Sequence, residues 1–414
     1  MSTKRREPSH PWQFVRRFRR GGFGWRSSVA VPAVREALKE IKSVARTDPA
    51  VAAEGAVRFL ERVSPALERV DSSSGAMGTA VYQAVRTLAE IIGDAPLDAA
   101  QRARLLDRVW KAVQDDGMGY LDVLENLWGR CCGSRDVASL WSDGFVDVLR
   151  GYLVRGEGAY LRGSTACLSA LYAAGRYDEL FSMLESDRLR WWNYRVWGFK
   201  ALVALGRPGE ALRYAKASRG INDGPAVDAA CEQLLLERGL DEEAYTRYGM
   251  AAAPRHATNL ATFRAMRKKY PRLDPAVLLG DLAASTPARE GRWFAAAVSA
   301  ELYDLALTLA RTSPADPKTL TRASGDRLSE DPAFSLAAAE LALDSIAQGY
   351  GFELSAGDVI DAYRLGVQAA EQLGSTLAYG QRVREIADSG DAFLRQSLAL
   401  AGVSVAQRAV SRRP

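Results

Sequence analysis

Histidine and cysteine are scarce in this sequence. The 414 residues include two histidines, His10 and His256, and four cysteines, with no Cys-x-x-Cys pair. Structural metal sites hold two such ligands on one local turn, so the sequence predicts no metal site and no cofactor. We expect the cysteines, Cys131, Cys132, Cys167 and Cys231, to be small buried apolar residues of a reducing compartment. Neither histidine lies in a motif that could supply a general base, so the sequence favours a protein that is not an enzyme.

Signals for β-strands and for membrane spans are also missing. The sequence has no Asn-Gly hairpin turn. No segment approaches the roughly 18 uninterrupted apolar residues of a membrane helix. The opening residues, MSTKRREPSHPW, lack the apolar stretch of a secretory signal. We therefore expect no sheet, no transmembrane segment and a cytoplasmic location.

Positive charge is concentrated at the N-terminus. The chain has a net charge of +5, and residues 1–26 alone carry eight basic residues against Glu7. That segment has a net charge of +7, which leaves −2 for the rest of the chain. The sequence predicts a basic N-terminal arm over residues 1–26 and a short basic tail over residues 401–414.

Helical patterns fill the rest of the chain. In residues 31–46, VPAVREALKEIKSVAR, the apolar residues Val34, Leu38, Ile41 and Val44 follow at steps of four, three and three. Seven prolines follow a residue that can cap a helix, and proline suits the first position of a helix. These pairs are Asp48-Pro49, Ser64-Pro65, Asp274-Pro275, Thr286-Pro287, Ser313-Pro314, Asp316-Pro317 and Asp331-Pro332. Ser355 and Asp358 have the spacing of a capping box. We predict an all-α fold of about twenty helices.

One segment recurs along the chain. LYAAGRYDELFSML, from Leu171, aligns with residues from Leu202 at an offset of 31 and with LLERGLDEEAYTRY after a further 33. Another step of 62 reaches VSAELYDLALTLA, where Glu301 replaces the glycine. An apolar helix, a glycine and a second helix form a hairpin that needs neighbours to bury its apolar faces. Such periods predict an α-solenoid of stacked, tetratricopeptide-like helical hairpins over residues 153–400, after an N-terminal helical region over residues 27–152.

Several segments resemble a widespread, uncharacterised bacterial family of helical-repeat proteins. The resemblance is carried by STACLSALYAAGRYDELFSMLES, NLATFRAMRKKYP, GRWFAAAVSAELYDLALTLA, SPADPKTLTRA and QGYGFELSAGDVIDAY. It spans most of the chain from about residue 27 onward. Some members of the family carry a SWIM-type zinc finger ahead of this region, and this chain has no Cys-x-Cys and Cys-x-His finger. The resemblance implies a helical-repeat fold and no catalytic residues.

The N-terminal arm is the first candidate binding site. On a helical wheel, PWQFVRRFRR places its apolar residues on one side and most of its arginines on the other, with Arg19 among the apolar group. The arginines are Arg16, Arg17, Arg19 and Arg20. This basic amphipathic helix could contact nucleic-acid phosphates, an anionic membrane surface or a protein partner. Alternatively, it could dock on the first repeat as a cap, or remain a solvated tail.

An aromatic and arginine-rich segment, RLRWWNYRVWGFK, is the second candidate. Side chains of these types dominate binding hot spots, and they also fill cores. The candidate binding residues are Trp191, Trp192, Tyr194, Arg188, Arg190 and Arg195. Trp197 lies in the apolar helix that leads to Gly206, so the favoured interpretation of this segment is mainly structural.

Taken together, these features predict a non-catalytic helical-repeat scaffold that binds a protein or peptide through its concave surface. The alternative is a nucleic-acid-associated protein that uses the arginine-rich arm. A third possibility is a hydrolase built on some of the 50 acidic residues, which offer many carboxylate pairs in space.

Overall fold

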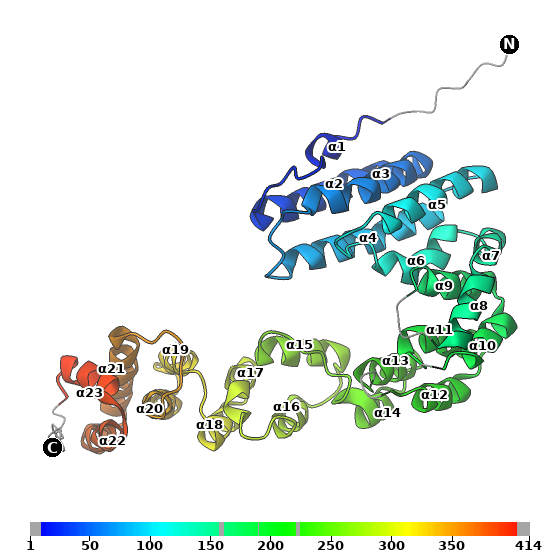
Figure 1. Cartoon of the computed structure of the whole chain (residues 1–414). Helices are drawn as coiled ribbons and strands as arrows, with labels where there is room; N and C mark the ends of the chain where they lie inside the picture. Colours follow the sequence, from blue (N-terminus) through cyan, green and yellow to red (C-terminus); the bar gives the residue numbers. More distant parts are fainter. Residues whose placement is uncertain (1–9, 157–160, 189, 221–223, 404–414) are drawn as a thin grey trace, which may run out of the picture. The chain divides into compact units, whose positions relative to one another are not determined.

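The computed structural model describes residues 10–156, 161–188, 190–220 and 224–403. Within these ranges the chain forms 23 α-helices, one π-helix (η1, Tyr245–Gly249), one 3-10 helix (η2, Glu290–Trp293) and no strand (Figure 1). The predicted all-α fold is therefore confirmed, and its arrangement is solenoid-like. Among the described residues no helix combines the length and apolar character needed to cross a bilayer. The chain divides into two compact units, Met1–Val227 and Asp228–Pro414.

Unit 1 stacks its helices in two layers. In the first layer, α2 contacts α4, α4 contacts α6, α6 contacts α9 and α9 contacts α11. In the second layer, α3 contacts α5 and α5 contacts α7. The first layer contains α2 (Ser27–Ala45), α4 (Ala76–Asp94), α6 (Val123–Cys132), α9 (Ser164–Ala174) and α11 (Trp192–Ala204). The second contains α3 (Pro49–Leu67), α5 (Ala99–Gln114) and α7 (Arg135–Asp143), followed by α8 (Val146–Arg155), α10 (Tyr177–Glu185) and α12 (Pro208–Ala217).

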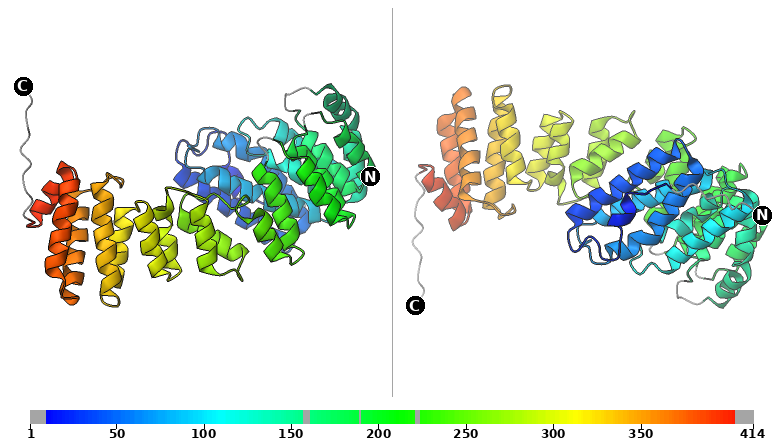
Figure 2. Two further views of the ribbon diagram at one scale, coloured as in Figure 1. Left: turned by 90° about the horizontal axis from the view of Figure 1, so that it is seen from below. Right: turned by 90° about the horizontal axis from the view of Figure 1, so that it is seen from above.

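Unit 2 repeats this two-layer plan (Figures 1 and 2). Within its first layer α15, α17, α19, α21 and α23 contact one another in chain order, and within its second layer α18, α20 and α22 do so. The first layer contains α15 (Asn259–Lys269), α17 (Phe294–Ser299), α19 (Pro317–Arg327), α21 (Ala356–Gln372) and α23 (Ala392–Leu400). The second contains α16 (Pro275–Ala284), α18 (Tyr303–Thr312), α20 (Pro332–Ala347) and α22 (Thr376–Ser389). Two further helices, α13 (Gly224–Leu236) and α14 (Asp241–Ala244), precede them.

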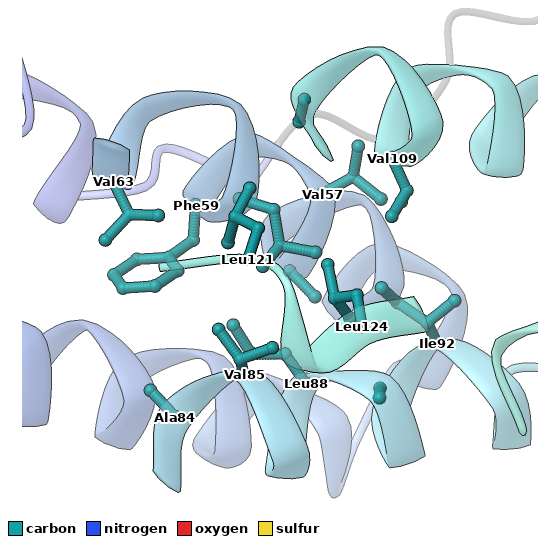
Figure 3. Packing of buried hydrophobic residues seen from close by; sticks show 14 of the residues in the cluster. Val57, Phe59, Val63, Ala84, Val85, Leu88, Ile92, Val109, Leu121 and Leu124 are labelled. Carbon is teal, nitrogen blue, oxygen red and sulfur yellow. The ribbon is translucent and has the colours of Figure 1, made fainter. Parts of the chain in front are cut away.

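The core of unit 1 lies between the two layers. Figure 3 shows Phe59 and Val63 of α3 facing Val85 and Leu88 of α4, with Leu121 between them. All five side chains are buried, and each exposes no more than 1% of its surface. Burial of this apolar surface holds successive helices together, because no single helix could shelter its own apolar stripe.

A buried arginine fixes the position of α5. The guanidinium of Arg102 donates hydrogen bonds to the carbonyl oxygens of Ala95 (2.6 Å), Cys131 (3.4 Å) and Ile92. These carbonyls lie at the C-terminal ends of α4 and α6, where backbone acceptors lack helical partners and the helix dipole is negative. Desolvation lowers the pKa of Arg102. The side chain therefore ties α5 to both neighbours at a buried point.

The recurring glycine position forms the same turn in each copy. Gly175, Gly206 and Gly239 have positive φ angles of 76°, 72° and 71°. The residue after each glycine donates its N–H to a carbonyl five residues earlier, at 2.9 to 3.0 Å, which is the Schellman pattern that ends a helix. Glu301, which replaces the glycine, has a φ of 60°, and Leu302 N–H bonds Ala297 O at 3.0 Å. The same turn therefore forms between α17 and α18, although Glu301 stands there in place of glycine.

Whether a proline pair begins a helix depends on the residue that precedes the proline. Every Asp-Pro pair begins a helix, with the aspartate as N-cap: Asp48, Asp274, Asp316 and Asp331. The expectation was wrong for the three Ser-Pro and Thr-Pro pairs. Pro65 lies inside α3, and the side chains of Thr286 and Ser313 instead accept hydrogen bonds from η2. Their hydroxyl groups are therefore engaged by another element and are not free to cap a helix. The capping box of Ser355 and Asp358 is confirmed at the start of α21.

The described part of the N-terminal arm, residues 10–26, docks on unit 1. Its helix, α1 (Phe14–Arg17), is shorter than the amphipathic helix expected from the sequence. Trp12, Phe14 and Phe18 are buried against α2 and α3, and the rings of Phe14 and Phe18 lie 5.9 and 5.1 Å from that of Phe59. Glu40 of α2 accepts hydrogen bonds from two arm N–H groups, at 2.8 and 3.2 Å. These contacts hold the arm along the first hairpin, and residues 1–9 lie outside the described part.

We expect Glu301→Gly to stabilise the turn between α17 and α18. A non-glycine residue with positive φ costs roughly 1 kcal/mol, part of which glycine returns by its larger freedom in the unfolded chain. The midpoint of urea unfolding should therefore rise modestly. The matched control is Gly206→Ala, whose added methyl group meets open space, so its expected loss of about 1 kcal/mol reports backbone strain alone. A fall in the midpoint with Glu301→Gly would contradict this assignment.

We expect Gly55→Val to release the arm. A Cβ atom at Gly55 would lie 2.2 Å from Cζ2 of Trp12, so the indole must leave its place on α3. Trypsin should then cut at Arg16 to Arg20 at least about tenfold faster, because cleavage requires local opening of the segment. Mass spectrometry of a digestion time course measures this. Gly78→Ala on α4 is the control, since nothing lies within 4 Å of its added carbon; equal cleavage rates in both variants would refute the docking contact.

Candidate functional site

A groove runs between α3 and α5 of unit 1. It has two lobes, of about 520 and 620 Å³, and Arg108 lines both. The first lobe is lined by His10, Trp12, Asp48, Ala50, Val51, Glu54, Arg58, Leu97, Gln101, Arg104, Leu105 and Arg108. The second is lined by Arg20, Leu60, Glu61, Ser64, Pro65, Glu68, Arg108, Lys111, Ala112, Asp115, Gly117 and Met118. Pockets of this size suit side chains of a bound segment or a small molecule.

The two walls of the groove differ in charge. Helix α3 supplies the carboxylates Glu54, Glu61 and Glu68, whereas α5 supplies Arg104, Arg108 and Lys111. The acidic wall follows from the periodicity of the α-helix, because residues seven apart along α3 lie on nearly the same face. Opposite charges on the two walls can therefore pair with each other across the groove.

Arg108 crosses the groove at its centre. Its guanidinium contacts Glu54 Oε2 at 2.6 Å and Glu61 Oε1 at 2.8 Å, and Arg58 also contacts Glu54, at 2.9 Å. The hydrogen bonds to Glu61 raise the pKa of Arg108 against the effect of burial. Burial raises the pKa of Glu54, but the hydrogen bonds from Arg108 and Arg58 outweigh it and lower the pKa overall. Glu54 is thus favoured in its ionised form, and both carboxylates are paired with Arg108, which does not suit them to donate a proton in catalysis.

Arg104 has a different environment from Arg108. It is exposed at the rim of the first lobe and makes no ion pair with any described residue. The same lobe is also lined by apolar residues, among them Val51, Leu97 and Leu105. The first lobe therefore combines an apolar surface with one unpaired positive charge.

The N-terminal arm contributes to both lobes. Trp12 and His10 line the first lobe, and Arg20 lines the second. The indole of Trp12 lies over Gly55, where the absent side chain leaves room for it. His10 is within 3.6 Å of Glu40 on α2. The arm is recognisable in the sequence by its charge, whereas the groove is not, because its two walls are separated by α4 in the chain.

The arginines of the arm are divided between paired and exposed positions. Arg17 forms an ion pair with Glu36, and Arg20 lies 3.3 Å from Glu68. Arg16 and Arg19 are exposed, and neither makes an ion pair with a described residue. The four arginines therefore do not act as one free basic surface, since two of them already balance acidic residues of α2 and α3.

The aromatic segment lies mostly inside unit 1. Trp192, Tyr194 and Arg195 are buried, with exposed fractions of 6%, 0% and 8%. Arg195 Nη1 lies 3.3 Å from the hydroxyl of Tyr214, and its guanidinium lies over the ring of Tyr214 at 5.6 Å. Arg188 and Arg190 are exposed and Trp191 is half-buried. The structure therefore does not bring the six candidate residues to one surface, because α11 turns three of them into the core.

The four cysteines are buried, and none of them forms a disulfide. Desolvation raises the pKa of Cys131, Cys132 and Cys167 to about 12, which disfavours the reactive thiolate. Within the described ranges no group of three or more His, Cys, Asp or Glu side chains could hold a metal ion.

Comparison with protein families shows a similarity over the N-terminal third of the chain. A family of unknown function (DUF6880) matches residues 20–142. This range runs from the end of the arm into α7, so it includes both helices that form the groove and excludes the aromatic segment. No curated protein matches the chain. The chain is thus similar, over residues 20–142, to proteins of an uncharacterised family.

Proposed function

We propose that this chain is a non-catalytic scaffold that binds a segment of another protein in the groove between α3 and α5. The observation that carries the proposal is the first lobe, where the unpaired Arg104 stands beside an apolar surface of Val51, Leu97, Leu105 and Trp12. Such a lobe fits an apolar side chain of the partner with a carboxylate close to it. Apolar anchors next to a charged contact are typical of protein interfaces.

The wider context supports the same function. We infer that the uncharacterised family is a bacterial family of helical-repeat proteins, some members of which carry a SWIM-type zinc finger. Proteins built from stacked, tetratricopeptide-like helical hairpins use extended surfaces to bind other macromolecules. We further propose that the protein acts in the cytoplasm, in keeping with four buried cysteines that form no disulfide.

The two other functions have less support. Nucleic-acid binding through the arm would rely on Arg16, Arg17, Arg19 and Arg20, and Glu36 and Glu68 already pair with Arg17 and Arg20. A hydrolase would need a carboxylate free to exchange a proton, whereas Glu54 and Glu61 in the groove are both bound to Arg108.

Site-directed crosslinking in host cells tests the proposal. We would place the photoreactive residue p-benzoylphenylalanine at Ala50, which lines the first lobe, and at Ala103, which is exposed on α5 outside the groove. The expected result is one crosslinked protein at position 50 and none at position 103. Equal crosslinking at the two positions would argue against a groove-bound partner.

Charge reversal then tests the contact with the protein that is captured. Arg104→Glu should weaken its binding at least about tenfold, which corresponds to about 1.4 kcal/mol, because it replaces the attractive charge by a repulsive one. Arg62→Glu on α3 makes the same change at an exposed position outside the groove and should alter the affinity by less than about twofold. Isothermal titration calorimetry measures both, and similar losses in the two variants would contradict the proposal.

A further inference from the structure

One stretch of unit 2 has no acidic residues. Residues 244–273 include seven basic residues and not a single Asp or Glu. The surrounding chain is acidic, since residues 228–403 contain 18 basic and 24 acidic residues, a net charge of −6. Positive charge is therefore concentrated on one part of an otherwise negative unit, around α15.

The local structure brings part of this charge to a single helix face. Thr258 caps the start of α15 and accepts a hydrogen bond from the N–H of Ala261. Phe263 and Met266 turn one face of the helix toward the core. Arg264 and Lys268 lie on the opposite face, are exposed, and are one turn apart, about 6 Å along the helix axis.

Three of the seven basic residues are already engaged. Arg247 pairs with Glu243, Lys269 lies 2.7 Å from the buried Glu232, and Arg267 donates to the carbonyl of Leu273. The other four are exposed, and none makes an ion pair with a described residue. Helix η2 contacts α15, and two more exposed arginines lie there, Arg292 within η2 and Arg289 directly before it. We call six exposed residues, on α15, next to it in the chain or at η2, the α15 basic surface: Arg255, Arg264, Lys268, Arg272, Arg289 and Arg292.

A structural explanation accounts for only part of this surface. Basic residues in the last turn of a helix stabilise its negative end, and Arg267, Lys268 and Lys269 occupy that turn of α15. Arg264 lies one turn earlier, and Arg255 and Arg272 lie outside the helix. Arg264 reaches α17, where its Nη2 is 3.5 Å from Ser299 Oγ, and a hydroxyl group does not neutralise it. Several unpaired charges therefore remain without an intramolecular role.

We propose that the α15 basic surface binds the phosphate backbone of a nucleic acid. Five of its six residues are arginines, whose forked donors match phosphate oxygens. Protein interfaces have an apolar centre, and residues 244–273 contain no exposed large apolar side chain. Three cavities lie elsewhere, two in the α3/α5 groove and one between α18 and α20. A surface of unpaired arginines without an apolar centre suits sequence-independent phosphate contacts.

Binding of a fluorescein-labelled DNA duplex to the full chain tests this proposal. Fluorescence anisotropy at about 50 mM salt should show binding, and the logarithm of the affinity should fall linearly with the logarithm of the salt concentration. The double variant Arg264→Gln, Lys268→Gln should bind at least about tenfold more weakly, and its salt slope should be smaller by about 2, one for each lost phosphate contact.

The matched control is the double variant Arg364→Gln, Arg384→Gln. It removes the same charge from exposed positions on α21 and α22 of the same unit, and neither residue makes an ion pair with a described residue. This variant should bind within about twofold of the original chain. Equal losses in the two double variants would overturn the proposal, because they would show a response to net charge alone.

Three other results would also overturn it. The first is absence of DNA and RNA binding by the unaltered chain. The second is a loss caused by Arg16→Gln, Arg19→Gln and not by the α15 variant, which would place the contact on the arm. The third is competition by poly-glutamate as effective as that by DNA at equal charge, which would assign the surface to an acidic protein segment. Circular dichroism of each variant confirms that the helices are retained.

Discussion

Burial of apolar surface between successive helices is the constraint on which this structure depends. Each helix has an apolar stripe too wide to be covered by its hairpin partner, so it must be covered by the next helix of the same layer. The contact of α6 with α9 shows how close this packing is: a Cβ atom at Gly129 would lie 2.3 Å from Ser169 O, and Gly129 N–H donates to Ser169 Oγ at 3.0 Å. Similarly, Gly366 of α21 leaves room for the ring of Tyr379 on α22. Stability is therefore local, and the outward faces of the helices remain free to vary.

Charge pairing distinguishes the two surfaces to which we assign function. In the α3/α5 groove almost every charge has a partner, with Arg108 joined to two glutamates and Arg104 left unpaired. We propose that this single unpaired charge, in a lobe with apolar side chains, selects one segment of a partner protein. Around α15 most of the exposed basic residues are unpaired, since residues 244–273 contain no Asp or Glu. Many free charges without an apolar centre provide attraction to a polyanion and little selectivity.

Helix composition and turns could be predicted from the sequence, because they depend on residues close together in the chain. Every Asp-Pro pair begins a helix, since aspartate caps through its own backbone neighbours. Thr286 and Ser313 do not cap helices, and their hydroxyl groups accept hydrogen bonds from Trp293 Nε1 and Gly291 N–H of η2 instead. Glu301 kept the turn without glycine, as the alignment of its neighbours indicated. The groove was not predictable, because its walls come from helices about fifty residues apart. The arm was recognisable in the sequence, but its docking depends on the contact of Trp12 with Gly55, which the spacing of residues in the arm does not reveal.

Native-state hydrogen exchange of the full chain with Leu343→Ala tests the local character of this stability most directly. Leu343 of α20 is completely buried, and its truncation should cost about 2 to 5 kcal/mol. If each helix depends mainly on its neighbours, protection should fall in α19 to α22 and stay unchanged in α2 to α6. A uniform loss of protection along the whole chain would contradict the account, because it would show that the helices unfold as one cooperative body.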